Sequence, residues 1–381
     1  MKLHADLYPM VVSNDKAWVI SGEDNFLYKI DLDKWEATYV EAVQSDKEDI
    51  WRGNYVGLEY ENKLICIPDR SDRIGIYDLV NEKMEYIQMP QNITTRWNIT
   101  AHILDGDTLY LFSQTKNMVL KVDLRSYSIE ICDCIEKEKS IVSVLAKEKE
   151  FWFLLQEGKL YLYKYNVISR KVDKIFIAEE RYEVMCCDGD NVWFSGKKKK
   201  VLFWNGQSNH TKEIDLSAID ICEYNIVAPK KENYVTTREE EFHYKLFYKL
   251  CVCGEYVWFF PFQTNHVIRV NRKNYFVEKI VLENETENVD TLQRRINGLN
   301  QYKLFWEMVD NEGDLFVYSF KNQVHYKIDI LTGCVKEIKP QIKVLNEETA
   351  RAMLLEKGKM FRERMDFSLK ELLRMKKNES K

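Results

Sequence analysis

The sequence predicts an all-β fold, a seven-bladed β-propeller of four-stranded antiparallel blades, followed by an α-helical C-terminal tail. Three observations lead to this expectation. A short pattern of an aromatic-rich strand, a polar turn and a strand ending in Asp or Asn recurs seven times. The repeats follow one another at intervals of roughly 40–50 residues, which is typical of propeller blades. Beyond the last repeat, apolar residues recur at helical spacing.

Two columns of residues keep the repeats in register. The centre of each aromatic-rich strand is occupied by Trp18, Ile65, Tyr110, Trp152, Trp193, Trp258 and Phe316. The end of each following strand is occupied by Asp31, Asp78, Asp123, Asn166, Asn205, Asn271 and Asp329. The columns are 13 residues apart in five repeats, 14 in one and 12 in one. Large rings fill the wedge between twisted sheets, and Asp and Asn cap the turn that leaves a strand.

Each repeat also contains an apolar segment before the aromatic-rich strand, and most contain an alternating segment after the polar column, which gives four strands. The seventh repeat has its own fourth segment, CVKEIK. Strand exchange between the termini is therefore expected to be either absent or restricted to residues 2–9. Two late insertions cover about residues 216–245 and 283–302. Both are expected on the face that carries the turns between the second and third strands of each blade.

Residues 8–339 resemble, at the level of the fold, the Kelch-like, NHL-like and streptogramin-lyase-like bacterial propellers. The resemblance rests on the number of repeats and on the Asp or Asn that ends the third strand. The Gly-Gly doublet of Kelch blades and the Trp-Asp ending of WD repeats are missing, and no catalytic His motif matches. The resemblance therefore implies the fold and conveys no function.

The sequence divides into a propeller over residues 1–340 and an amphipathic helical tail over residues 341–381. Asn346 precedes acidic residues that favour the first turn of a helix, and Gly358 kinks or divides the helix. Residues 347–381 contain ten Lys or Arg against seven Asp or Glu. The tail is expected to dock on the propeller; a partner's groove, which would serve assembly, and a membrane surface are the alternatives.

Composition limits the partners and the compartment. A net charge of −5 and a pI near 5.9 lack the basic character expected of a protein that binds nucleic acid. No apolar run is long enough to span a membrane, and the N-terminus lacks the pattern of an export signal. The nine cysteines do not have the spacing of a disulfide framework. We expect reduced thiols and a cytoplasmic location, and the abundance of Lys, Glu and Ile suggests a bacterial source.

A basic and aromatic set is expected on the loop-bearing face. Its members are Trp51, Arg52, Arg70, Arg73, Arg96, Trp97, His266, Arg294 and Arg295, together with Asn54, Asp69 and the run Lys197–Lys200. Arginine and lysine supply positive charge for an anion, and arginine can also bind it through two parallel N–H groups. Tryptophan supplies a stacking surface. The alternative is a solvated rim with rings packed under the loops.

A second set is expected near the central channel. Equal register on the inner strands places Lys249 beside Glu307, with His102 and Ser143 elsewhere on the ring. A buried carboxylate beside a lysine is either an acid–base pair or a structural ion pair that closes the channel.

Motifs for metals and cofactors are missing. The pairs Cys132/Cys134 and Cys251/Cys253 each project two thiols on one face of a strand, but no CxxC or HxxxH accompanies them. A P-loop, GxGxxG, GxSxG and HExxH are absent as well. We expect no metal and no cofactor.

Two functions remain at this stage. The first is a non-enzymatic binding or scaffold propeller whose loop-rich face binds a protein partner or an anionic small molecule. The second is a lyase or hydrolase that acts at the mouth of the central channel.

Overall fold

The computed structural model describes most of the propeller and none of the chain beyond residue 343. The described residues are 7–13, 16–21, 25–43, 54–69, 71–90, 97–134, 139–196, 198–219, 246–261, 266–282, 305–311, 313–319, 324–338 and 341–343.

The first four blades use consecutive strands. Blade one contains β1 (Leu7–Ser13), β2 (Lys16–Ser21), β3 (Phe26–Asp31) and β4 (Glu36–Ala42). Blade two contains β5 (Asn54–Tyr60), β6 (Lys63–Pro68), β7 (Arg73–Asp78) and β8 (Lys83–Gln88). Blade three contains β9 (Ile99–Asp105), β10 (Thr108–Ser113), β11 (Met118–Asp123) and β12 (Ile129–Cys134). Blade four contains β13 (Ile141–Lys147), β14 (Glu150–Leu155), β15 (Leu160–Asn166) and β16 (Val172–Ala178).

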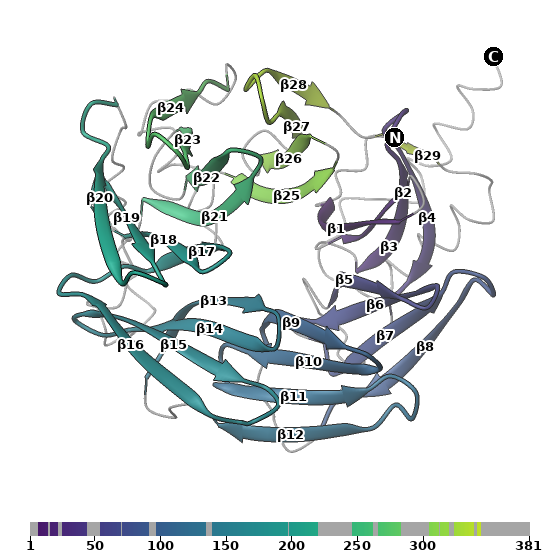
Figure 1. Ribbon diagram of the computed structural model, residues 1–381. Coiled ribbons are helices and arrows are strands. Elements are labelled where there is room, and N and C mark those ends of the chain that lie inside the picture. Colours follow the sequence, from purple (N-terminus) through teal and green to yellow (C-terminus); the bar gives the residue numbers. More distant parts are fainter. Residues whose placement is uncertain are drawn as a thin grey trace, which may run out of the picture.

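Three further blades complete the ring. Blade five contains β17 (Val184–Asp188), β18 (Asn191–Ser195), β19 (Lys200–Asn205) and β20 (His210–Asp215). Blade six contains β21 (Phe247–Cys253), β22 (Tyr256–Pro261), β23 (Val267–Asn271) and β24 (Val277–Ile280). Blade seven contains β25 (Phe305–Asn311), β26 (Asp314–Ser319), β27 (Val324–Asp329) and β28 (Val335–Ile338). Figure 1 shows the seven sheets around one axis, with the first strand of each blade innermost. The predicted all-β seven-bladed fold is confirmed.

The aromatic column occupies equivalent places in all seven blades. Each member is the third residue of the second strand of its blade, from Trp18 in β2 to Phe316 in β26. All seven are buried, and Trp193 and Trp258 are 0% exposed. The prediction that these side chains fill the wedge between sheets is confirmed.

Hydrophobic clusters join the blades in a closed ring. Within the described residues there are seven such clusters, and each combines side chains of two adjacent blades. The cluster between the last blade and the first contains Phe316 and Ile338 from blade seven with Phe26 and Tyr28 from blade one. Burial of apolar surface between every neighbouring pair therefore holds the ring together.

The polar column ends the third strand in every blade and caps the turn that follows. The Asp31 Oδ1 atom accepts hydrogen bonds from the backbone N–H groups of Asp33 at 3.2 Å and Lys34 at 3.1 Å. The same contacts recur at Asp78, Asp123, Asn166, Asn205 and Asn271, and Asp329 accepts from Thr332. The predicted capping is confirmed, and its geometry is that of an Asx turn.

Acid is expected to weaken the turn that follows β3. A hydrogen bond from Lys16 at 2.8 Å, with the backbone donors of the turn, lowers the pKa of Asp31 to about 2. A carboxylate with a lowered folded pKa stabilises the fold above its unfolded value, near pH 4, and loses this effect as the pH falls toward about 2. The Asp31→Asn variant keeps the turn acceptor and loses the charge. The Tm difference between the unmodified protein and this variant is expected to shrink between about pH 6 and pH 2; a constant difference contradicts this account.

The ring closes by an additional strand and not by exchange within a blade. Blade seven uses its own outer strand, β28, which pairs antiparallel with β27. A further strand, β29 (Gln341–Lys343), pairs in parallel with β4, with Gln341 opposite Glu36 and Lys343 opposite Thr38. Blade one is therefore five-stranded, in the order β1-β2-β3-β4-β29. The C-terminal part of the described chain is attached to the outer edge of the first blade (Figure 1).

Several predicted features lie outside the described residues. These are the amphipathic helix after Asn346, most of the first late insertion, and the second insertion. Within the described part of the chain, no helix is long and apolar enough to cross a membrane.

Candidate functional site

The loop face is the face that carries the turns between the second and third strands and the connections between blades. Side-chain amides tie these two kinds of loop together. The Asn25 amide donates to the Val43 carbonyl at 2.7 Å, and its oxygen accepts from the backbone N–H of Asn54 at 3.0 Å. In blade three, the Asn117 amide donates to the Lys139 carbonyl at 2.8 Å. The loops that connect successive blades are therefore fixed relative to the blades.

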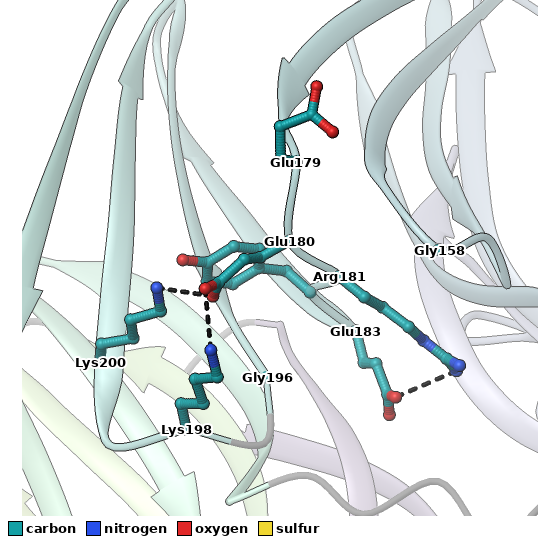
Figure 2. A pocket seen from close by; sticks show the side chains of 9 residues that line it. Gly158, Glu179, Glu180, Arg181, Glu183, Gly196, Lys198 and Lys200 are labelled. Carbon is teal, nitrogen blue, oxygen red and sulfur yellow. Dashed lines mark hydrogen bonds and ion pairs between the residues drawn. The ribbon is translucent and has the colours of Figure 1, made fainter.

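A pocket opens on the loop face between blades four and five. It has a volume of about 360 Å³ and is lined by Gly158, Glu179, Glu180, Arg181, Tyr182, Glu183, Gly196, Lys198 and Lys200. Gly158 belongs to the turn between β14 and β15, and residues 179–183 connect the two blades. Gly196 and Lys198 lie between β18 and β19, and Lys200 begins β19. We call this the blade 4–5 pocket (Figure 2).

One side of the blade 4–5 pocket is an ion-pair cluster centred on Glu180. Lys198 Nζ lies 2.8 Å from one carboxylate oxygen of Glu180, and Lys200 Nζ lies 2.6 Å from the other. Figure 2 shows both lysines converging on this carboxylate. Hydrogen bonds from Lys198 and then Lys200 lower the pKa of Glu180. Burial alone would lower the pKa of Lys200, but its bonds to Glu180 and Glu213 outweigh burial, and the net shift is upward.

The other side holds a buried ion pair. Arg181 extends toward Glu183, with its Nη2 atom 3.0 Å from the carboxylate (Figure 2). The Glu183 side chain is only 1% exposed, whereas that of Arg181 is 27% exposed. The backbone N–H of Glu183 donates to the Ser195 carbonyl at 2.9 Å, which fixes this residue against β18. A buried carboxylate is stable in such a place only when it is paired and hydrogen-bonded.

Two further residues shape the blade 4–5 pocket. The Tyr182 ring is 3% exposed, and its buried hydroxyl lies close to the Lys200 ammonium group. Burial raises the pKa of this hydroxyl to about 12, so it stays protonated and can donate. A Cβ atom on Gly158 would meet no atom within 4 Å, so the wall at this point is open space.

The mouth of the central channel contains a second group of polar side chains. The Tyr55 hydroxyl donates to the Ile99 carbonyl at 3.1 Å. Burial, followed by the charge of Asp69, raises the pKa of Tyr55, and the charge of Lys249 opposes this shift. Burial lowers the pKa of His102, against a smaller raising effect of the backbone at Gly57. Tyr55 was not singled out by the sequence.

The structure places the backbone of the predicted pair Lys249 and Glu307. Lys249 lies opposite Phe260, the fifth residue of β22, whereas Glu307 lies opposite Val317, the fourth residue of β26. Measured against the second strand of its own blade, Lys249 is therefore one residue out of register with Glu307. The Glu307 side chain lies outside the described part of the structure.

The structure describes only some of the predicted loop-face residues. Trp97 is 3% exposed and packs in the cluster between blades two and three, under the loops. Arg73 is half-buried over the Tyr86 ring, 3.5 Å from Asp72, and His266 is 8% exposed. Lys198 and Lys200, which belong to the predicted basic run, line the blade 4–5 pocket. Trp51, Arg52, Arg70, Arg96, Lys197, Arg294 and Arg295 lie outside the described residues.

The sequence interpretation missed the acidic half of the pocket. Residues 179–183 read EERYE, a charged run between two strand segments, which is typical of a solvated connection. The one feature of this run that could have indicated a site is Tyr182, an aromatic residue between charged neighbours.

Within the described part of the chain, no group of three or more His, Cys, Asp or Glu residues has a metal-binding arrangement. Cys251 and Cys253 lie with their sulfur atoms 3.7 Å apart, and the described cysteines are free thiols.

The fold and the pocket define a seven-bladed β-propeller with a polar pocket on its loop face. No protein-family model matches the sequence, and no curated protein matches it. Among solved structures, the computationally designed Ika8 protein is similar with a TM-score of 0.52, 8% identity and 89% of each chain covered.

Two natural proteins are similar to the same extent. One is the extracellular domain of a putative one-component system from B. thetaiotaomicron, with a TM-score of 0.52, 14% identity and 84% of this chain covered. This chain spans 38% of that protein. The other is a chain of a mitotic checkpoint complex, with a TM-score of 0.52, 9% identity, and 86% of this chain and 90% of that chain covered. Likeness at such low identity shows the fold alone.

Proposed function

We propose that this protein is a non-enzymatic binding propeller that holds its ligand, or one protruding group of a larger partner, in the blade 4–5 pocket. The observation that carries this proposal is the position of the pocket. Loops of two adjacent blades build it on the face where rigid scaffolds usually carry their binding residues. Its volume of about 360 Å³ lies within the roughly 300–1,000 Å³ of small-molecule sites. A cytoplasmic location is part of the same proposal.

The open wall at Gly158 offers a direct test. A tyrosine at this position adds a ring to the open space at the wall of the blade 4–5 pocket, whereas an alanine adds one atom that meets no neighbour. Gly158→Tyr is therefore expected to abolish ligand retention, and Gly158→Ala is expected to keep it. Native mass spectrometry of the full chain after incubation with a metabolite extract measures retention. Equal retention by both variants contradicts the proposal.

The second candidate is an enzyme that acts at the mouth of the central channel. It is favoured by one observation, the half-buried Tyr55, whose hydroxyl donates to the Ile99 carbonyl and whose pKa responds to the charges of Asp69 and Lys249. A phenol in this setting can transfer a proton if a neighbouring cation offsets the effect of burial and lowers its raised pKa. This candidate predicts a substrate turnover that Tyr55→Phe abolishes and Gly158→Tyr leaves unchanged.

A further inference from the structure

The charges of the described residues that line the blade 4–5 pocket sum to zero. The three cations are Arg181, Lys198 and Lys200, and the three carboxylates are Glu179, Glu180 and Glu183, so the total is 3 − 3 = 0. The next residues outward do not change this balance, because Lys159 pairs with Glu179 at 2.7 Å and Glu213 pairs with Lys200 at 2.7 Å. Among the described residues, the basic side chains of the pocket are thus balanced by carboxylates; Lys197 lies outside the described residues.

A ligand with a net charge is disfavoured in such a pocket. An incoming carboxylate that took Arg181 would compete with Glu183, which is 1% exposed and would remain as a buried charge with a weakened partner. An incoming cation that took Glu180 would compete with two lysines at 2.8 and 2.6 Å. In either case the new contact replaces an existing one and adds an uncompensated charge.

An uncharged ligand with many hydroxyl groups avoids this cost. An ion pair does not use all the hydrogen-bonding positions of its members, because a guanidinium has five N–H groups and a carboxylate has about four lone-pair sites. The exposed members of the pocket, Arg181 at 27%, Glu180 at 43% and Lys198 at 67%, therefore present donors and acceptors at the same opening. Adjacent hydroxyl groups of a sugar ring each donate and accept, which matches this alternation without separating the ion pairs.

We propose that the blade 4–5 pocket binds a neutral saccharide, as a free sugar or as the terminal residue of a short chain. This inference rests on the proposed function, because it names the ligand class of the same site. It assigns contacts to Arg181 and to the cluster of Lys198 and Lys200 around Glu180. It excludes phosphates and sugar acids as preferred ligands of this pocket.

The test is isothermal titration calorimetry of the full chain with a matched panel. The panel contains glucose, galactose, mannose and their neutral disaccharides, with glucuronate, glucosamine and inorganic phosphate as charged counterparts. At least one neutral sugar is expected to bind saturably, and its acidic and amino analogues are expected to bind at least tenfold more weakly. Gly158→Tyr is expected to abolish this binding, while Gly158→Ala retains it.

A charge-changing variant separates a saccharide site from a general polar cavity. Glu183→Gln makes the pocket positive by one charge, so the preference is expected to shift toward glucuronate. Tighter binding of a charged probe to the unmodified protein, sensitive to Gly158→Tyr, overturns the saccharide inference and leaves the proposed function intact. Binding by no sugar in the panel also overturns the inference. If native mass spectrometry in addition finds no ligand that Gly158→Tyr removes, the proposed function fails as well.

Discussion

Replacing Trp258 with alanine is expected to lower the free energy of unfolding by about 3–5 kcal/mol. The side chain is 0% exposed and lies in the cluster between blades six and seven with Leu315, Val317 and Tyr326. Removal of the indole leaves a cavity at an interface that the ring needs for closure, because each blade contacts only its neighbours. Chemical denaturation followed by far-UV circular dichroism measures the change.

Two variants control this experiment. Trp258→Phe keeps a ring in the same wedge and is expected to lose less than half as much stability as the alanine variant. Phe276→Ala removes a ring that is 61% exposed and is expected to change stability by no more than about 0.5 kcal/mol. A loss at Trp258→Ala as small as that at Phe276→Ala contradicts the assignment of the aromatic column to the core.

The second large effect is expected at Arg269, which links blades six and seven. Its guanidinium is buried, lies 2.5 Å from the Glu278 carboxylate, and donates from Nη1 to the Ile330 carbonyl at 2.7 Å and the Leu331 carbonyl at 3.2 Å. The guanidinium also stacks on Tyr256, 4.0 Å from the ring centroid. Arg269→Met is expected to destabilise the protein by about 2–4 kcal/mol, because it removes charge-assisted bonds and leaves Glu278 without its cation.

The double variant Arg269→Met/Glu278→Met tests the cause of this effect. Removal of both charges leaves no orphaned carboxylate, so the double variant is expected to recover part of the lost stability. The free energy of unfolding of all four proteins in the cycle gives the coupling. A double variant at least as unstable as Arg269→Met would show that the ion pair does not account for the loss.

The repeat could be predicted from the sequence because each blade has the same two structural requirements. A wedge between twisted sheets needs a large apolar side chain, and Trp18, Trp152, Trp193 and Trp258 supply it at one strand position. The turn that leaves the third strand needs a side-chain acceptor, which Asp31 and its counterparts supply. Both requirements are local to one hairpin, so they leave a periodic signal in the sequence.

The closing strand β29 left no such signal. It has three residues, and its partner β4 lies about 300 positions earlier in the chain. The parallel pairing is made by backbone groups, which do not depend on side-chain alternation. Proximity of the two segments in space follows only after the ring has been assembled.

The candidate site was predicted in part. The run that contains Lys198 and Lys200 was placed on the loop face, where the structure has it. Its acidic partners were missed, because a Glu-rich connection is typically exposed and nothing local indicates that Glu183 is buried. Trp97 was a candidate stacking surface, but the approach of blades two and three covers its ring. Burial of this kind depends on two blades meeting.

Hydrogen–deuterium exchange of the full chain, with and without the tightest-binding sugar of the panel, tests the central claim most directly. The blade 4–5 pocket predicts slower exchange in the turn at Gly158, in residues 179–183 and in residues 198–200, with little change in β5 and β21. Protection confined to the inner strand ends around Tyr55 and Lys249 would instead place the ligand at the channel mouth and contradict the account.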